Sequence, residues 1–272
     1  MKVLVIDAYN MLHRSRFGYG SGPHSITFNF FRSLRSEIER HDPHIVYIVL
    51  EGSPKHRFIL NKDYKGNRTP VVDDNFHRQK KDIFDLCKSL PVKVIRHPEY
   101  ECDDVIGYIC TIRHSDDQTV IVSSDSDFIQ LLENERVKLW NPIKKKYVSQ
   151  WPVDYVMWKS LKGDPTDNIP GIKGIGEKRA FSLVANVSTL WEMLDRDEEK
   201  RRIYDSAYAQ IKLAPIERDD PKIEEHTYKF NKTHVHDEFS NREFKSIVNN
   251  SMWKKWCTTL EKLNDAVESY VK

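Results

Sequence analysis

The chain has 272 residues, of which 39% are hydrophobic and 31% are charged, and its net charge is +2. These values fit a globular protein with one large domain, or a main domain with a smaller second one, and they exclude a disordered or collagen-like chain. No apolar run approaches the ~20 residues of a membrane span. We expect a cytoplasmic protein without a signal peptide, and four cysteines without a CxxC pair indicate free thiols.

Short apolar runs alternate with helical patterns over residues 1–150. The expected strands are Val3–Ile6, Ile45–Leu50, Val92–Ile95, Val120–Val122 and Val137–Trp140. The expected helices between them are Ser25–Arg40, Asp73–Leu90 and Asp103–Arg113. Nearly continuous apolar runs are typical of a parallel sheet that is covered on both faces. Residues 1–150 are therefore predicted to form a three-layer α/β domain with a central, mostly parallel sheet.

The strand pattern stops after about Trp151, so residues 151–272 are predicted to be helical. The expected helices are Trp151–Leu161, Glu177–Ala185 and Ser188–Leu194, while the charged segment 195–202 is a solvated helix or loop and 215–225 a connection. Apolar residues recur at three- and four-residue steps in the tail, at Met252, Trp256, Leu260, Leu263 and Val267. This spacing predicts an amphipathic helix that docks on the body or, alternatively, on a partner.

The histidine pair His234 and His236 is not predicted to bind a metal ion. His234 and His236 would share one face of a strand. No third or fourth ligand is evident, so zinc is not expected there.

Acidic side chains follow three of the predicted strands at the point where each strand ends. Asp7 ends the first strand, Glu51 ends the second, and Asp125 and Asp127 follow the fourth. In open α/β sheets, ligands bind at the carboxyl ends of the parallel strands. These four carboxylates are therefore expected at one edge of the sheet.

Two further acidic groups complete a set of nine carboxylates. Glu101, Asp103 and Asp104 open a predicted helix, where capping explains one acid but not three. Asp164 and Asp167 lie in a predicted turn, which alone would be structural. Together the nine would repel one another, so bound cations are expected to neutralise them. Oxygen ligands without Cys or His favour two Mg²⁺ ions, with Mn²⁺ able to substitute, and such ions catalyse in-line displacement at phosphorus.

Basic residues outside these carboxylates suit a polyanionic substrate. The remaining 32 acidic residues are outnumbered by 43 basic ones. The segment 55–85 interleaves lysines and arginines with Phe58, Tyr64 and Phe76, a pattern typical of a segment that follows a phosphate backbone and stacks on bases. A solvated loop and helix face is the alternative.

The segment Ile169–Ala180 predicts a second nucleic-acid contact. Its glycines permit a tight turn, and backbone N–H groups at a helix start form an anion site. Nearby positive charge comes from Lys173, Lys178 and Arg179. These features together predict a helix-hairpin-helix that holds duplex phosphates without recognising sequence, although a merely structural helix–turn–helix is the alternative.

Five ordered motifs in this chain resemble those of the 5′-nucleases, the family of flap endonucleases and 5′–3′ exonucleases, in their bacterial or bacteriophage form. The motifs are Asp7–Arg14, Tyr64–Arg68, Glu101–Asp104, Ser123–Asp127 and Gly163–Gly176. The resemblance runs from Asp7 to about Leu194. It implies a PIN-like α/β nuclease domain over 1–150, with a basic arch at about 55–85. A helical DNA-binding region over 151–272 would contain a helix-hairpin-helix (helix-3-turn-helix) at 163–185 and the amphipathic tail helix.

The resemblance also implies metal ligands. The inner ion would be held by Asp7, Glu101 and Asp103. The outer ion would be held by Asp125, Asp127, Asp164 and Asp167. Asp104 would lie between them, and Glu51 would replace the family's usual Asp at the inner site. Because glutamate is one methylene longer, the geometry at the inner ion is expected to shift.

Catalytic and DNA-binding roles are implied as well. Lys65 and Arg68 would act in catalysis by placing positive charge on the scissile phosphate. Tyr64 would stack on a displaced base, and Arg14 would contact a phosphate. The duplex would be anchored by Lys173, Gly174, Gly176, Lys178 and Arg179, with K⁺ as a candidate ion at the hairpin carbonyls.

The sequence thus predicts a structure-selective nuclease that hydrolyses DNA at 5′ ends, nicks or 5′ flaps. RNA–DNA hybrid primers are a further candidate substrate, and replication proteins are candidate partners in replication and repair. We expect a monomer without membrane association. Two alternatives stay open: a PIN-type ribonuclease that cuts single-stranded RNA, and a DNA-binding protein without catalytic activity. The hairpin disfavours the first, and the nearly complete carboxylate set disfavours the second.

Overall fold

The structure, a computed structural model, describes residues 1–20, 22–69 and 73–270, with side chains described as far as Ala266. The expected arch at 55–85 therefore includes residues 70–72, which lie outside the described part. The side chain of Val267 also lies outside it.

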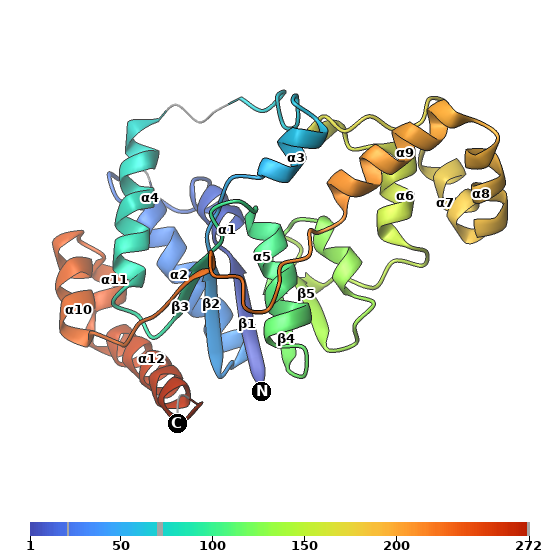
Figure 1. The fold of residues 1–272 in the computed structure, drawn as a ribbon. Helices are drawn as coiled ribbons and strands as arrows, with labels where there is room; N and C mark the ends of the chain where they lie inside the picture. The colour runs from blue at the N-terminus through green and yellow to red at the C-terminus, as the bar shows by residue number, and fades with distance from the viewer. Residues whose placement is uncertain (21, 70–72, 271–272) are drawn as a thin grey trace.

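Within the described residues, one mixed sheet of seven strands forms the centre of the molecule, in the order β6-β5-β4-β1-β2-β3-β7 (Figure 1). The strands are β1 (Lys2–Asp7), β2 (Ile45–Val49), β3 (Lys93–Arg96), β4 (Gln118–Val122), β5 (Val137–Asn141), β6 (Lys146–Tyr147) and β7 (Glu224–Thr227). Strands β1 to β5 are parallel, and they match the five predicted strands. Asp7 pairs with Val49 and Ile6 with Val122, so these strands end at the same edge of the sheet.

The prediction that no strand follows Trp151 is wrong, because β7 pairs antiparallel with β3. Ion pairs cross this edge, from Lys93 to Glu225 at 2.8 Å and from Arg96 to Glu224 at 2.7 Å. Charged residues are common on edge strands, where they discourage aggregation. Because β7 is polar and short, it lacks the apolar alternation by which a strand is recognised in sequence.

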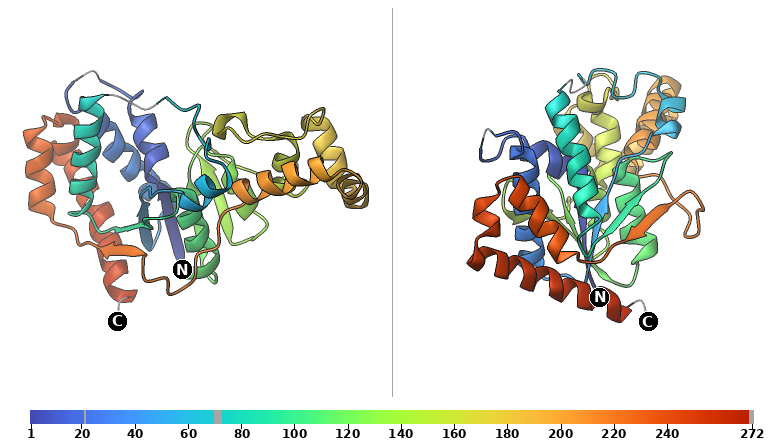
Figure 2. Two further views of the ribbon diagram at one scale, coloured as in Figure 1. Left: turned by 45° about the horizontal axis from the view of Figure 1, so that its top comes forward. Right: turned by 90° about the vertical axis from the view of Figure 1, so that its left-hand side faces the viewer.

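Helices cover both faces of the sheet (Figures 1 and 2). The α-helices of the described residues, including those that do not cover the sheet, are α1 (Ala8–Ser15), α2 (Ser25–His41), α3 (Lys55–Leu60), α4 (Asp74–Cys87), α5 (Cys102–Tyr108), α6 (Tyr155–Lys162), α7 (Glu177–Ala185), α8 (Val187–Asp195), α9 (Glu198–Ile211), α10 (Lys232–Asn241), α11 (Lys245–Val248) and α12 (Asn250–Tyr270). Successive residues of β1 point to opposite faces. Leu4 and Ile6 join a core with α2, α4 and α12, and Val3 and Val5 join a second core with α5. The predicted three-layer α/β domain is confirmed.

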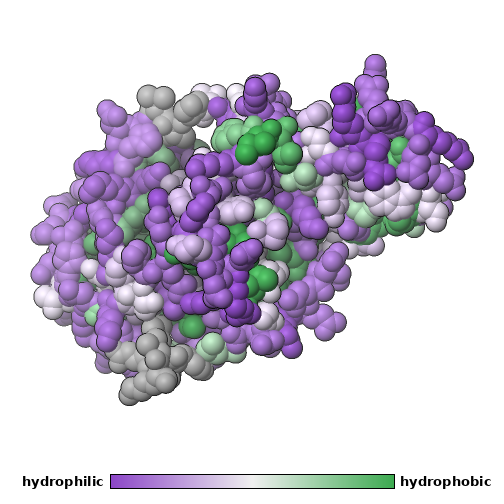
Figure 3. All heavy atoms as spheres, in the orientation of Figure 1, coloured by the Kyte–Doolittle hydropathy of each residue, from purple (hydrophilic) through white to green (hydrophobic). Residues whose placement is uncertain are grey.

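Helices α6 to α9 form a lobe beside the sheet (Figures 1 and 2). The helix expected from Trp151 begins at Tyr155 instead, because the Asp154 side chain caps it by accepting from the Met157 N–H at 2.8 Å. The charged segment 195–202 spans the end of α8 and the start of a longer helix, α9, which Asp197 caps. Exposed apolar side chains gather on α3 at Phe58–Leu60, on an otherwise mostly hydrophilic face (Figure 3).

The C-terminal helices return to the sheet rather than extending the lobe. Trp256 and Leu260 on α12 are each 1% exposed and belong to the core formed by β1, α2 and α4, so docking of the tail on the body is confirmed. His234 and His236 lie on α10, so the expectation of a strand there is wrong; Asn231 caps this helix. Among the described residues, no helix is both long and apolar enough to span a bilayer.

Candidate active site

The carboxyl ends of β1, β2 and β4 and the start of α5 surround a pocket of about 670 Å³. Its acidic lining consists of Asp7, Glu51, Glu101, Asp103, Asp125 and Asp167. A second pocket of about 530 Å³ is lined by Asp125, Asp127, Asp164 and Asp167. The two pockets are neighbours, since Asp125 and Asp167 line both. The structure thus brings together eight of the nine carboxylates that the sequence predicts.

Asp7 is held by its neighbours in a buried position. It caps α1 by accepting from the Asn10 N–H at 2.9 Å, and it accepts from the Ser123 hydroxyl at 2.8 Å. Asn10 in turn donates to the Ser124 hydroxyl oxygen at 2.8 Å, which joins α1 to the turn after β4. Burial raises the pKa of Asp7 to about 6, and the charge of Asp125 adds to the rise. Asp7 is therefore a carboxylate whose charge the protein alone does not fully compensate.

Two other carboxylates of the larger pocket, Asp103 and Glu51, also have raised pKa values. Burial raises the pKa of Asp103 well above its usual range, with contributions from the charges of Asp125 and Asp7. Burial, followed by the charge of Glu101, raises the pKa of Glu51 to about 7. Hard divalent cations favour such groups of carboxylate oxygens. The described residues that line this pocket include one histidine, His13, and no cysteine. The donor set therefore suits divalent metal ions.

Lys65 and Arg68, which the family resemblance places over the site, lie against its carboxylates in the structure. Lys65 Nζ lies 2.5 Å from Glu101 Oε1 and 3.9 Å from Asp167 Oδ2, and Arg68 forms an ion pair with Asp167. Burial alone would lower the pKa of Lys65, but the charges of Glu101 and Asp167 raise it, so this lysine is cationic. Arg14 also lines the pocket, beside Asp7.

Tyr64 differs from its predicted role. Its side chain is 5% exposed, and its hydroxyl donates to Glu101 Oε2 at 2.9 Å. The ring lies in a small core with Val156 and Ile169, so in this arrangement it has no free face for a nucleobase. Tyr64 instead orients one of the carboxylates, a role that follows from tertiary packing.

Asp104 is the predicted carboxylate that does not face either pocket. It is fully buried, and both of its oxygens accept from Arg57 in α3, at 2.7 and 2.8 Å. Oδ2 also accepts from the Glu101 N–H at 3.2 Å, which completes a capping box at the start of α5. The structure thus places Asp104 outside the two pockets, with both oxygens engaged by Arg57 and the backbone.

Two basic residues of the site, Arg57 and Lys159, are not predicted by the sequence pattern. Arg57 lies in the basic segment 55–85 without a feature that distinguishes it from its neighbours, and Lys159 lies in α6. Lys159 is 6% exposed and forms ion pairs with Asp127 and with Asp164, the latter at 2.7 Å. The only available signal was a lysine four to five residues before the Gly-Asp turn, which is too common to be informative.

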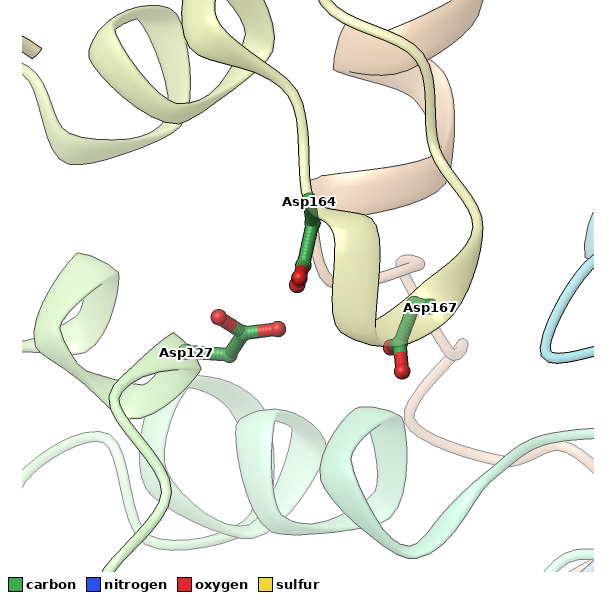
Figure 4. A group of neighbouring side chains, drawn as sticks. All are labelled: Asp127, Asp164 and Asp167. Carbon is green, nitrogen blue, oxygen red and sulfur yellow. The ribbon is translucent and has the colours of Figure 1, made fainter. Parts of the chain in front are cut away.

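Asp127, Asp164 and Asp167 form the group best placed to hold a cation. Each offers one carboxylate oxygen, and these oxygens lie within 4.8 Å of one another (Figure 4). Burial raises the pKa of Asp127 to about 6, against the effect of Lys159. The pKa of Asp164, in contrast, lies below its usual range. Burial raises this pKa, but the hydrogen bond with Lys159 and the charge of Lys159 outweigh burial and lower it. The lysine thus partly neutralises this pocket.

The predicted hairpin leads into α7 and carries unpaired positive charge. Gly174 has a φ of +81°, and Gly176 caps α7. Ile172 and Ile175 are buried and fix the turn against the lobe. Its basic side chains are all exposed, and within the described residues none forms an ion pair; they are Lys173, Lys178 and Arg179.

Comparisons with known proteins agree with this geometry. A family model for the 5′-3′ exonuclease N-terminal, resolvase-like domain matches residues 2–158, and one for the 5′-3′ exonuclease C-terminal SAM fold matches residues 150–234. The 5′-3′ exonuclease of Aquifex aeolicus is 29% identical over 242 residues, which cover 78% of this chain and 82% of that protein. DNA polymerase I of Caldicellulosiruptor bescii is 29% identical over 283 residues, which cover 91% of this chain. The chain spans only 33% of that polymerase.

Solved structures show the same fold. A bacteriophage T5 5′-exonuclease with bound zinc aligns with a TM-score of 0.64 and 19% identity, over 98% of this chain and 99% of that chain. The T5 D15 flap endonuclease in complex with DNA and metal ions aligns with a TM-score of 0.64 and 18% identity, over 97% and 100% of the two chains. Since the two family models together cover most of the chain, it belongs to the 5′-3′ exonuclease family.

Proposed function

We propose that this chain is a divalent-metal-dependent nuclease that hydrolyses phosphodiester bonds of DNA at 5′ ends, nicks or 5′ flaps. The convergence of eight carboxylates with Lys65 and Arg68 at one edge of the sheet carries the proposal. Family membership supports it, since relatives include a 5′-3′ exonuclease and DNA polymerase I. The similarity to a flap endonuclease that was solved with DNA supports a branched substrate.

Two groups of residues would hold two Mg²⁺ ions. The first group is Asp7, Glu51, Glu101 and Asp103. The second group is Asp125, Asp127, Asp164 and Asp167. When bound, such ions activate water and offset the charge that develops on the attacking and leaving oxygens of a phosphodiester. The raised pKa values of Asp7, Glu51 and Asp127 support this assignment, because cations would relieve the repulsion that buried carboxylates share.

The chain's own cations would stabilise the reacting phosphate. Lys65 and Arg68 bind carboxylates of both groups, so a phosphate between these groups would meet their side chains. Preorganised positive charge in a partly buried site stabilises a transition state more than the same charge in water. Lys159 would share Asp127 and Asp164 with the second ion or withdraw from them.

The hairpin would supply the duplex contact. Exposed Lys173, Lys178 and Arg179 flank a glycine turn and a helix start, an arrangement that suits phosphate oxygens. A K⁺ ion at the hairpin and RNA–DNA hybrid substrates stay predictions.

Asp125→Asn with Asp127→Asn tests the proposed site. We expect this variant to lose Mg²⁺-dependent cleavage of a 5′-flap substrate and to retain binding of the same DNA in Ca²⁺. The control is Asp219→Asn with Asp237→Asn, which changes two surface acids and should cut at the wild-type rate. Near wild-type cleavage by the Asp125/Asp127 variant would falsify the assignment of the site.

A panel of labelled substrates tests the proposed activity itself. We expect cleavage of flap, nicked and 5′-recessed DNA with Mg²⁺ and little cleavage of unstructured RNA. Preference for unstructured RNA would indicate a ribonuclease, and absence of turnover on every branched DNA would indicate a binding protein.

A further inference from the structure

A buried arginine joins three segments at the base of the candidate active site. Arg57 in α3 is 2% exposed, and its two Nη atoms donate to the two oxygens of Asp104, at 2.7 and 2.8 Å. Nη1 also donates to Glu101 Oε2 at 2.8 Å, and Nε donates to the carbonyl oxygen of Gln210 at 2.9 Å. A single guanidinium thus links α3, the start of α5 and the end of α9.

Asp104 has its oxygens directed toward this arginine and the backbone. Oδ1 also accepts from the Ala214 N–H at 2.8 Å, and Oδ2 accepts from the Glu101 N–H at 3.2 Å. The side chain is fully buried and lines neither acidic pocket. Its position therefore suits a partner for Arg57 rather than a ligand for an ion in the pocket.

The two oxygens of Glu101 have different surroundings. Oε2 accepts from Arg57 and from the Tyr64 hydroxyl, at 2.8 and 2.9 Å. Oε1 accepts from Lys65 Nζ at 2.5 Å, and Lys65 lines the pocket together with Glu101, whereas Arg57 and Tyr64 do not. The hydrogen bonds to Oε2 thus fix the rotation of the carboxylate and leave Oε1 facing the pocket.

We propose that Arg57 is a positioning residue for metal binding, which holds Glu101 with Oε1 toward the pocket, and that Asp104 orients Arg57 instead of binding an ion. This inference rests on the proposed function, because it assumes a metal site at Glu101. Groups that orient a metal ligand contribute about 10–100-fold to metal affinity. An arginine suits the role, since its planar fork binds a carboxylate through two parallel hydrogen bonds, which a lysine cannot do.

Binding of Mn²⁺ to the DNA-free protein, followed by electron paramagnetic resonance of free Mn²⁺, tests the proposal without turnover. Arg57→Lys should keep the number of bound ions and weaken their affinity about 10–100-fold. Arg96→Lys changes an exposed arginine that pairs with Glu224 and should leave affinity unchanged. Asp104→Asn should behave as Arg57→Lys does, whereas Asp103→Asn, at the pocket, should bind one ion fewer.

A double-mutant cycle separates positioning from a general effect on folding. In a Glu101→Gln background Arg57 has no metal ligand to orient, so adding Arg57→Lys should change Mn²⁺ affinity little. Fully additive losses would contradict a role through Glu101. Wild-type affinity in Arg57→Lys, or loss of an ion in Asp104→Asn as in Asp103→Asn, would overturn the inference.

A second variant covers the case in which Arg57→Lys does not fold, as judged by thermal unfolding. Arg57→Met with Asp104→Leu replaces the buried pair by apolar side chains, a change that buried ion pairs often tolerate. It should fold and bind Mn²⁺ weakly, and wild-type affinity would again overturn the inference. A wild-type protein that binds Mn²⁺ but cuts no DNA would defeat the proposed function alone.

Discussion

Lys65 is the residue whose charge the proposed chemistry uses most directly. It lies between Glu101 and Asp167 and is held cationic by them. We expect Lys65→Ala to lower kcat on a 5′-flap substrate about 10²–10³-fold, because one preorganised donor is lost from the transition state, with a smaller change in KM. Steady-state kinetics check this expectation.

Neighbouring Lys62 provides the matched control for Lys65. It is exposed, so Lys62→Ala should leave kcat within about twofold of the wild type. Lys65→Arg keeps the charge but changes its shape and should recover only part of the activity. An unchanged kcat in Lys65→Ala would remove its proposed role.

The buried carboxylates make the stability of the metal-free protein depend on pH. Burial raises the pKa of Asp7 to about 6 and of Glu51 to about 7, so the folded state holds these protons more tightly than the unfolded state does. The protonated side chains of these two residues stabilise the folded state fully below their unfolded-state pKa values, near 4. This stabilisation is lost as the pH rises through their folded-state pKa values of about 6 and 7. On the proposed assignment, Mg²⁺ would bind the deprotonated groups, so it should restore stability mainly at high pH.

Differential scanning calorimetry at pH 5.5 and pH 8 measures this linkage. The rise in Tm on adding Mg²⁺ should be larger at pH 8, and Asp7→Asn with Glu51→Gln should remove most of the difference. Equal rises at the two pH values would contradict the assignment of these carboxylates as metal ligands.

At the scale of elements, the Gly-Asp turn that carries Asp164 and Asp167 depends on one close backbone approach. Gly163 has a φ of +79°, and a Cβ there would lie 2.4 Å from the backbone nitrogen of Gly171. We expect Gly163→Ala to reduce the free energy of unfolding by about 1–3 kcal/mol and to weaken Mn²⁺ binding, because the turn must move. Chemical denaturation and Mn²⁺ titration measure the two effects.

Gly174 in the hairpin is the control for this prediction. It has a φ of +81°, but a Cβ there would meet no atom within 4 Å. Gly174→Ala should therefore cost about 1 kcal/mol through backbone strain alone and leave Mn²⁺ affinity unchanged. A Gly163→Ala variant as mild as Gly174→Ala would show that the turn tolerates the displacement.

At the scale of the whole molecule, the distribution of charged residues suits the binding of a polyanion such as DNA. The acidic site lies at the sheet edge, and the exposed bases of the hairpin lie on the lobe formed by α6 to α9 (Figure 1). We expect Lys173→Gln, Lys178→Gln and Arg179→Gln together to weaken duplex binding and to reduce the slope of log K against log salt by about 0.9 per lost phosphate contact. Fluorescence anisotropy at several salt concentrations in Ca²⁺ measures this slope.

Two lysines on the C-terminal helices serve as the control for the hairpin variant. Lys232 on α10 and Lys262 on α12 pair with Glu261 and Asp42. Both helices lie away from the lobe (Figure 1). Changing both to Gln should leave the slope nearly as in the wild type. A similar loss in both variants would mean that binding follows net charge rather than the hairpin.

The sequence by itself determined the five parallel strands, the carboxylates at their ends and the basic hairpin. These features depend on local patterns: apolar runs specify buried strands, and strand ends converge in any open parallel sheet. Lys65 and Arg68 were recognised differently, through the resemblance of residues 64–68 to a motif of the 5′-nucleases.

Only the tertiary structure decided which carboxylates face the pocket and which partners compensate them. Arg57 reaches Asp104 and Gln210 across 47 and 153 residues of sequence, and Lys159 reaches Asp127 across 32. The buried hydroxyl of Tyr64 and the polar strand β7 also depend on such distant contacts. Charge compensation depends on distance in space, which residue spacing does not specify, and the burial that makes a carboxylate need a partner exists only once the chain has folded.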